Sequence, residues 1–262
     1  MHPILFKIPI FGGITIHTYG FLVALAYLVA LAWVSRESKI QGLDSAKATD
    51  LSFYVILSAI IGSRLLHVLI SERERFFENP LIFFKIWEGG LVFYGGLIAS
   101  LIVAVWYIRR NHLYFWSYGD VFAPAISLGH AIGRLGCFMA GCCHGREIGY
   151  DAWYGVIFPA NPNSFAPTGI PLYPTQLMEV IGEFLTFALL LIIRRKKRFE
   201  GQLLATYLIA YALLRGFVEY FRGDYIRGFI IDPWLSTSQF ISIIMLLIGL
   251  GIYIKRWNKL KI

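Results

Sequence analysis

Seven stretches of mostly apolar residues constrain this chain most, because about 20 such residues in a helix cross the hydrocarbon core of a bilayer. Only 15% of the 262 residues are charged, against roughly 25% in soluble proteins. A soluble fold cannot cover its surface with so few charges, so the sequence predicts an all-α polytopic membrane protein. A cytosolic enzyme, a disordered chain and a secreted disulfide scaffold are excluded. The predicted spans are roughly 15–34, 51–70, 91–108, 116–138, 176–193, 203–222 and 236–254.

The basic residues predict the orientation of the chain. Lys and Arg exceed Asp and Glu, 24 to 16, and in membrane proteins they concentrate in cytoplasmic loops. Fourteen lie in one set of alternating loops and six in the other. This favours an N-terminus outside and a C-terminus in the cytoplasm, and no nucleic-acid partner. We expect a single integral-membrane domain over 1–262, with an extracytoplasmic cap at 139–175.

Ionisable side chains inside the predicted spans mark a candidate site, because charge in a bilayer is costly and usually functional. Arg64, Arg134 and Arg215 all fall in the outer half of their spans. Arg215, Glu219 and Arg222 share helical spacing, which predicts one stripe along the sixth span. A proton or ion path would require charges across the full thickness of the membrane, and the sequence has no such series.

Two further stripes have helical spacing: residues 130, 134 and 137 on the fourth span, and 176, 179 and 183 on the fifth, and we expect the three stripes to face one another. Together the stripes predict a water-accessible cavity in which arginines outnumber carboxylates. Such a cavity favours an anion, because Arg binds phosphate through two nitrogens and keeps its charge. In an outer leaflet that anion is a phospholipid headgroup. Internal ion pairs that only hold helices together remain an alternative, chiefly for Arg64 and Arg222; Arg134 has no carboxylate one turn away.

Tyr94 stands between two glycine pairs, at 89–90 and 95–96, at the outer start of the third span. Glycines allow close helix packing, and aromatic residues collect at membrane interfaces. The local sequence therefore leaves a functional role and an interfacial role equally open for Tyr94.

The three cysteines, Cys137, Cys142 and Cys143, precede His144. Thiolates and imidazole are zinc ligands, but this spacing lacks the paired C-x2-C elements of structural zinc sites. We therefore predict no metal. A disulfide on the oxidising outer face is an alternative, a catalytic thiol is another, and packing is the default.

Five segments, taken in order, resemble the motifs of the bacterial prolipoprotein diacylglyceryl transferase family. The segments at residues 17–20, 62–64, 133–146, 173–179 and 214–222 read HTYG, GSR, GRLGCFMAGCCHGR, YPTQLME and LRGFVEYFR. They are similar to the family's H-x-Y-G, G-x-R, G-R-x-G-N-F-x-N-G-E-x-x-G, H-P-[ST]-Q-L-Y-E and F-R-x-x-x-E-[FY]-x-R. The resemblance covers essentially the whole chain.

The departures from these motifs fall on groups that handle protons. Tyr94 stands where the family has a histidine before a glycine pair, and Tyr173 replaces the histidine that opens the fifth-span motif. Cys137, Ala140 and Cys142 replace two asparagines and a glutamate. The arginines of the motifs are kept.

The resemblance implies transfer of a diacylglyceryl group from phosphatidylglycerol to the lipobox cysteine of a secreted prolipoprotein, at the outer leaflet of the bacterial cytoplasmic (inner) membrane. The lipid bilayer and prolipoprotein signal peptides are the other partners, and no cofactor is needed. Arg134 and Arg215 would bind the phosphate, with Tyr19 and Tyr94 as further catalytic candidates. The remaining residues expected around phosphatidylglycerol are Arg64, Gln176 and Glu219.

Two other functions stay open from the sequence. A divergent relative would act on another thiol or lipid acceptor, with or without a covalent role for Cys137 or Cys142. A transporter or lipid-binding protein without catalysis would show duplicated halves or interrupted helices, and the sequence shows no duplication.

Overall fold

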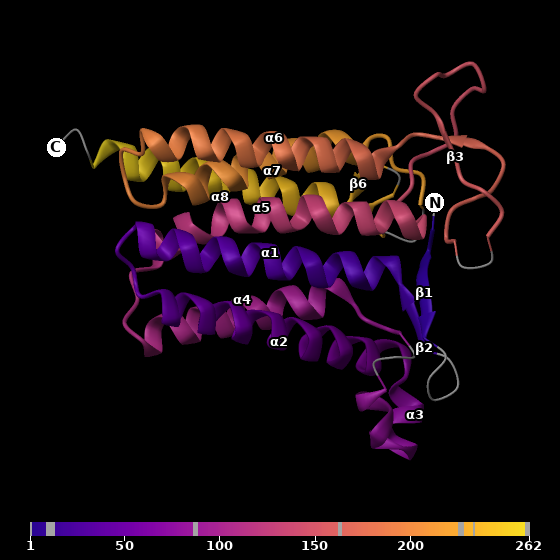
Figure 1. Ribbon diagram of the computed structural model, residues 1–262, viewed down its shortest axis with the longest axis horizontal. Coiled ribbons are helices and arrows are strands. Elements are labelled where there is room, and N and C mark those ends of the chain that lie inside the picture. Colours follow the sequence, from indigo (N-terminus) through magenta and orange to yellow (C-terminus); the bar gives the residue numbers. More distant parts are fainter. Residues whose placement is uncertain are drawn as a thin grey trace. The chain divides into compact units, whose positions relative to one another are not determined.

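The protein is described by a computed structural model over residues 2–8, 14–85, 89–161, 164–224, 228–232 and 234–259. Within these residues every predicted span is a helix (Figure 1), which confirms the all-α fold class. The long helices are α1 (Thr18–Ile40), α2 (Ser45–Ser71), α4 (Phe93–Arg110), α5 (Phe115–Ala140), α6 (Thr175–Arg195), α7 (Gln202–Glu219) and α8 (Thr237–Asn258).

Six of the described helices are long and apolar enough to cross a membrane, and α7 is not among them. α7 begins at Gln202 and carries Arg215 and Glu219 toward its end, which lowers its mean hydropathy. The chain is thus a multi-pass membrane protein, while the seventh span and the orientation stay predictions. Among the basic residues that support the orientation, Arg227 and Lys261 lie outside the described residues.

One predicted stripe is wrong at its end. α7 finishes at Glu219, so Arg222 lies beyond the helix, where its backbone N–H donates to the Glu219 carbonyl at 3.2 Å. Arg222 pairs instead with Asp224, through an Nε–Oδ1 hydrogen bond of 2.8 Å and an Nη2–Oδ2 contact.

Short elements join the helices. β1 (Ile4–Ile8) pairs with β2 (Ile14–His17), β3 (Val156–Ile157) with β4 (Pro171–Leu172), and β5 (Phe229–Ile231) with β6 (Leu235–Ser236), all antiparallel. α3 (Arg73–Glu78) and the 3-10 helix η1 (Pro80–Phe84) follow α2. Strands of two to five residues are too short for an alternating pattern to predict.

The segment expected as a cap, 139–175, contains β3 and β4 and has a small core of its own. Phe158, Ala166 and Leu172 are buried together in this core. After it the chain re-enters a long helix at Thr175. This segment is therefore folded where it is described, and its assignment as an extracytoplasmic cap stays a prediction.

The chain divides into two compact units. One unit contains the start of α1 and most of α5 to α8; its apolar core includes Ala123, Leu190, Leu203 and Tyr207. The fully buried Asp120 carboxylate on α5 accepts the backbone N–H groups of Gly201 at 2.8 Å and Leu204 at 3.1 Å. These bonds satisfy donors that the first turn of a helix leaves without partners, and they fix the start of α7 against α5.

The other unit, 34–118, contains the end of α1, together with α2, α3, η1 and α4. α2 and α4 pack closely where glycines face each other. A Cβ at Gly62 would overlap the carbonyl oxygen of Gly95 and the Cβ of Ala99, and a Cβ at Gly95 would overlap the carbonyl of Gly62. Small residues at this crossing therefore set the distance between the two helices.

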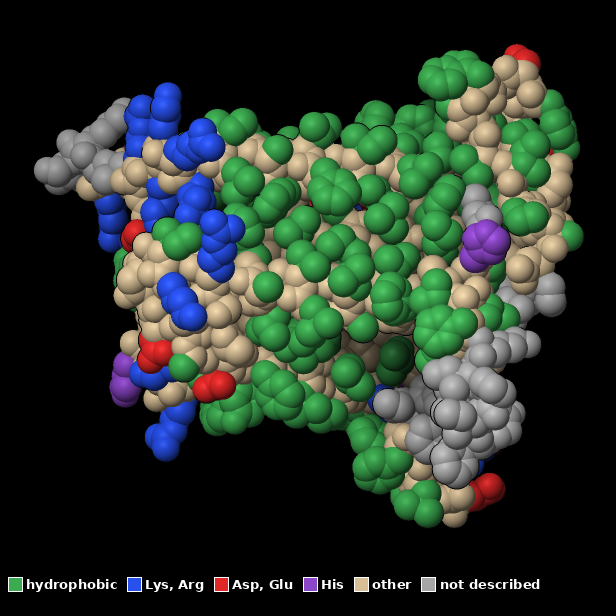
Figure 2. Space-filling model, in the orientation of Figure 1, with side chains coloured by type: hydrophobic (Ala, Val, Ile, Leu, Met, Phe, Trp, Pro, Cys, Tyr) green, Lys and Arg blue, Asp and Glu red, His purple; other side chains and the backbone are tan. Residues whose placement is uncertain are grey.

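The surface of the first unit separates apolar from basic side chains. Figure 2 shows hydrophobic side chains along the helices and Lys and Arg gathered where α6 and α8 end. The basic side chains there come from the last turns of α6 and α8 and from the connection to α7: Arg194, Arg195, Lys196, Lys197, Arg198, Lys255, Arg256 and Lys259. This band agrees with the predicted cytoplasmic end.

Replacing Gly62 with Leu is expected to lower the free energy of unfolding by about 1–3 kcal/mol, because the added side chain overlaps backbone atoms of α4. Thermal unfolding of the purified protein in detergent measures this. Gly251→Leu on α8 is the matched control, since a Cβ there meets nothing within 4 Å. Equal melting temperatures for the two variants would contradict the close α2–α4 packing.

Candidate functional site

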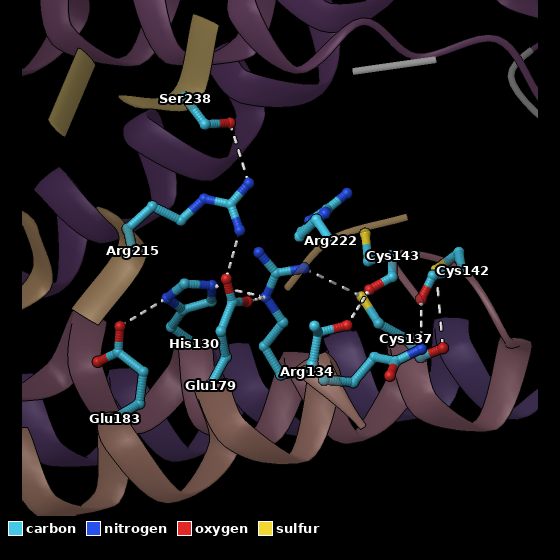
Figure 3. A network of polar contacts seen from close by, with 12 residues as sticks. His130, Arg134, Cys137, Cys142, Cys143, Glu179, Glu183, Arg215, Arg222 and Ser238 are labelled. Carbon is cyan, nitrogen blue, oxygen red and sulfur yellow. Dashed lines mark hydrogen bonds and ion pairs between the residues drawn. The ribbon is translucent and has the colours of Figure 1, made fainter. Parts of the chain in front are cut away.

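The centre of the site is one carboxylate between two guanidinium groups. Glu179 on α6 pairs through Oε1 with Nη1 of Arg215 on α7 at 2.5 Å. Its other oxygen, Oε2, contacts Nε of Arg134 on α5. Figure 3 shows the three side chains converging, and all three are largely buried. Sequence spacing did not predict the Arg134–Glu179 pair, because its members lie on different helices.

Arg215 has two further partners. Its Nη2 lies 2.7 Å from Oε2 of Glu219, one turn along α7, and donates to the Ser238 hydroxyl at the start of α8 at 2.9 Å. Glu219, which the sequence places on the same stripe, therefore lies where it can hold Arg215. Ser238 carried no signal in the sequence.

A second branch runs from Arg134 along α5. Arg134 Nε donates to Nε2 of His130 at 3.1 Å, and His130 Nδ1 lies 2.8 Å from Oε1 of Glu183. The Ser127 hydroxyl is 2.7 Å from the other oxygen of Glu183. Because Nε2 accepts from Arg134, the proton on a neutral His130 belongs on Nδ1, facing Glu183.

The charges in this network do not match the expected excess of arginine. The network contains two guanidinium groups, of Arg134 and Arg215, and three carboxylates, of Glu179, Glu183 and Glu219; His130 links Arg134 to Glu183. The expected cavity with more arginines than carboxylates is thus wrong for this part of the site. One edge of the Arg134 guanidinium nevertheless has no oxygen acceptor: in the described part of the chain, its terminal nitrogens donate no hydrogen bond to an oxygen.

The start of α6 holds the loop that follows α5. Gln176 Nε2 donates to the carbonyl of Cys142, and Thr175 Oγ1 donates to the carbonyl of Cys143, both at 2.8 Å. Gln176 is 1% exposed, and its Oε1 accepts no hydrogen bond from any described residue. A buried acceptor without a donor is costly, so Gln176 is suited to accept from a ligand.

The three cysteines converge although they are not regularly spaced. Their sulfur atoms all lie within 4.8 Å of one another, and no disulfide joins them. Gly141 has a φ of +76° and Cys143 a φ of +60°, and these turns bring the loop back to the end of α5. Nη1 of Arg134 lies 4.0 Å from the Cys137 sulfur.

The surroundings of the thiols shift the pKa values of Cys142 and Cys143. Hydrogen bonds from Cys137 and Cys142 lower the pKa of Cys143, and the charges of Arg134 and Arg222 act in the same direction. Hydrogen bonds to the other two thiols raise the pKa of Cys142. The pKa of Cys143 and the pKa of Cys142 are therefore shifted in opposite directions.

Tyr19 belongs to the same unit. It lies in the first turn of α1, and a Cβ at Gly136 would lie 3.2 Å from its ring, so glycine lets α1 and α5 approach closely there. Tyr19 interacts electrostatically with Cys137 and Arg134. The structure thus brings together Tyr19, Arg134, Gln176, Arg215 and Glu219 of the predicted site residues.

Arg64 and Tyr94 belong to the other unit. Arg64 is 2% exposed and donates to the carbonyls of Phe83 at 3.1 Å, Gly89 at 2.7 Å and Ile82 at 2.5 Å. It also pairs with Glu72 at 3.7 Å. These contacts support the alternative of a structural role, and binding of a substrate by Arg64 stays a prediction.

Tyr94 is half-buried in the first turn of α4, after the helix cap Val92. Its ring packs edge to face against Phe93, with the centroids 5.7 Å apart. Trp87, at the start of the glycine-rich stretch, lies outside the described residues.

The fold and the network define a polytopic membrane protein with a buried, charged site at one end of its helices. The chain matches the family model described as prolipoprotein diacylglyceryl transferase over residues 3–255. It is 34% identical to phosphatidylglycerol–prolipoprotein diacylglyceryl transferase 2 of Clostridium perfringens, over 95% of this chain and 93% of the relative. It is also 34% identical to phosphatidylglycerol–prolipoprotein diacylglyceryl transferase of Clostridium tetani, over 99% of this chain and 100% of the relative. The chain belongs to the prolipoprotein diacylglyceryl transferase family.

Replacing Glu179 with Gln is expected to lower the free energy of unfolding by about 3 kcal/mol, because two buried guanidinium groups lose their shared carboxylate. Denaturant unfolding in detergent measures the loss. Glu74→Gln, on the exposed side of α3, is the control and is expected to change little. A loss at Glu179 no larger than at Glu74 would show that this network does not hold the helices together.

Proposed function

We propose that this chain transfers a diacylglyceryl group from phosphatidylglycerol to the cysteine thiol of a prolipoprotein lipobox, which forms a thioether and releases glycerol phosphate. Family membership supports the reaction, and the names of the relatives contain both substrates. The observation that links this reaction to a site is the Arg134 guanidinium, which is fixed through Nε and whose terminal nitrogens donate to no oxygen of the described residues.

The proposed place is the bacterial cytoplasmic (inner) membrane, with the site toward the outer leaflet. The basic side chains at the ends of α6 and α8 support this orientation, since Lys and Arg favour the cytoplasmic side. Arg134 lies near the opposite end, in the last two turns of α5. A phospholipid of the outer leaflet would reach it there, together with a signal peptide emerging from the membrane.

Arg134 is the proposed phosphate ligand. As the bond between glyceryl carbon and phosphate oxygen breaks, negative charge grows on the departing phosphate, and donors already in position stabilise it. Glu179 and His130 fix Nε of Arg134, so little reorganisation is needed. The terminal nitrogens of Arg215 are occupied by Glu179, Glu219 and Ser238; Arg215 therefore binds phosphate by exchanging one of these partners or acts through Glu179.

Activation of the thiol is the second requirement, because a free thiol with a pKa of about 8.5 is mostly protonated at neutral pH. Tyr94 stands where the resembling motif has a histidine. With an ordinary pKa of about 10, a tyrosine is a weak proton acceptor at neutral pH. Nearby positive charge is the alternative, since it lowers the pKa of the substrate thiol itself.

Purified protein, phosphatidylglycerol and a synthetic lipobox peptide test the reaction, with mass spectrometry of the peptide. We expect a mass gain of one diacylglyceryl group. Arg134→Ala is expected to reduce the rate at least about 100-fold through loss of charge stabilisation, whereas Arg110→Ala, at the far end of α4, keeps it. No mass gain with the unaltered protein would contradict the proposed function and indicate another thiol or lipid as the substrate.

Replacing Tyr94 with Phe separates the two ways of activating the thiol. We expect transfer to the lipobox peptide to remain within about threefold of the unaltered protein, because tyrosine is a poor base at neutral pH. The initial rate of peptide modification is the measurement. A loss of about 100-fold with unchanged melting temperature would identify Tyr94 as the base.

A further inference from the structure

The sulfur atoms of Cys137, Cys142 and Cys143 form a group that we call the thiol cluster. We propose that the thiol cluster binds one Zn²⁺ ion as three thiolates and leaves a fourth coordination position for the thiol of the lipobox cysteine. The ion would then supply the substrate thiolate beside Arg134. This proposal deepens the transferase function and depends on it for the identity of the incoming thiol.

The size of the cluster fits zinc. A Zn–S bond of about 2.3 Å and tetrahedral angles place the sulfur atoms about 3.8 Å apart. In the structure the three atoms lie within 4.8 Å of one another. Movements of less than about 1 Å per thiol therefore close the site. The C-x4-C-C spacing that argued against a metal in the sequence is no obstacle once the loop folds back onto α5.

The backbone holds this arrangement before any ion binds. Cys137 is on α5, whereas Cys142 and Cys143 follow its end, and their carbonyls accept from Gln176 and Thr175. Cys143 occupies the left-handed region, with φ at +60°. A side chain in this conformation costs energy, and such residues concentrate at functional sites. Two hydrogen bonds from the first turn of α6 keep the backbone of Cys142 and Cys143 in place.

The charges nearby also suit a thiolate site. Zn²⁺ with three thiolates has a net charge of −1, which requires positive neighbours in a partly buried place. Arg134 Nη1 lies 4.0 Å from the Cys137 sulfur, and Arg222 interacts with Cys143. Figure 3 shows Arg134 and Arg222 beside the cysteines.

Three ligands define the chemistry. Structural zinc sites have four protein ligands, whereas catalytic sites have three and an open position. Among the described residues only these three side chains form the group, and His144 next to them is 3.0 Å from the Gly145 carbonyl through Nδ1. A thiol that coordinates zinc is deprotonated outright, so the open position would produce a nucleophile without a protein base.

The step balances without another reactant. The lipobox thiol gives up its proton to solvent when it binds the ion. Its sulfur then attacks the glyceryl carbon that bears the phosphate ester; the C–S bond forms while the C–O bond breaks. The electron pair of the C–O bond leaves with glycerol phosphate, whose new charge faces Arg134, and the ion is unchanged.

Binding is tested on the reduced, full-length protein in detergent, with Zn²⁺ in competition with a chromophoric chelator. We expect one ion per chain and at least tenfold weaker binding in Cys142→Ser and Cys143→Ser. His144→Gln, beside the cluster, is the matched control and keeps the ion. Binding that survives the Cys→Ser substitutions would overturn the proposal.

Cd²⁺ in place of Zn²⁺ reports the metal ligands through its absorption. This test uses the folded, unaltered protein and therefore does not depend on the folding of a variant. Thiolate-to-cadmium charge-transfer absorption should appear and should rise by about one third when the lipobox peptide adds a fourth thiolate. A peptide with serine for the lipobox cysteine should leave the absorption unchanged. Absence of this absorption, or a disulfide in protein purified without oxygen, would overturn the site.

Transfer with and without metal separates the site from the reaction. Removal of zinc should reduce diacylglyceryl transfer at least 100-fold, and stoichiometric Zn²⁺ should restore it. Transfer that persists in metal-free protein would overturn the zinc proposal and leave the proposed function intact. Zinc that binds as proposed, in protein that modifies no peptide, would instead contradict the proposed function, and with it the identity of the incoming thiol.

Discussion

The Glu179 carboxylate between Arg134 and Arg215 is the interaction on which the larger unit depends. The carboxylate lies on α6 and its two partners lie on α5 and α7, so the interaction joins three helices. Breaking a buried pair leaves an uncompensated charge, which is strongly destabilising, and a bilayer core offers little water to replace the lost partner. The same ion pairs therefore hold these helices together and balance the charges of the site. Ser238 extends the same network to α8, through Arg215.

The same interaction prepares the site for a ligand. Arg134 uses Nε for Glu179 and His130, which fixes the plane of its guanidinium group and directs the terminal nitrogens toward the thiol cluster. Groups held in this way need little reorganisation when charge develops on a substrate. Arg215 is more fully enclosed by its partners. The two arginines thus differ in their contacts: the terminal nitrogens of Arg134 donate to no oxygen of the described residues, whereas those of Arg215 are held by Glu179, Glu219 and Ser238.

The sequence predicts those features that depend on neighbours along the chain. Apolar length predicts all seven long helices, and i, i+4 spacing predicts the Arg215–Glu219 pair. The sequence does not predict the Arg134–Glu179 pair, because its members are 45 positions apart and no spacing rule connects them. The sequence does not predict the thiol cluster either, since the cluster depends on two residues with positive φ after α5. The cost of a charge in the membrane predicts a functional Arg64, but the structure supplies backbone carbonyls as its hydrogen-bond acceptors.

Two departures from the family motifs become related once the thiols converge. Tyr94 replaces a histidine, which is the side chain best suited to accept a proton near neutral pH. Cys137 and Cys142 replace polar residues of the signature and, with Cys143, form a group of metal-binding size. Packing accounts for either substitution alone but gives no reason for both in one chain. Activation of the substrate thiol by a bound ion gives that reason, because a coordinated thiol is deprotonated without a base. In the proposed zinc site, the bound ion would activate the thiol in place of the histidine of the resembling motif, and Arg134 would bind the phosphate.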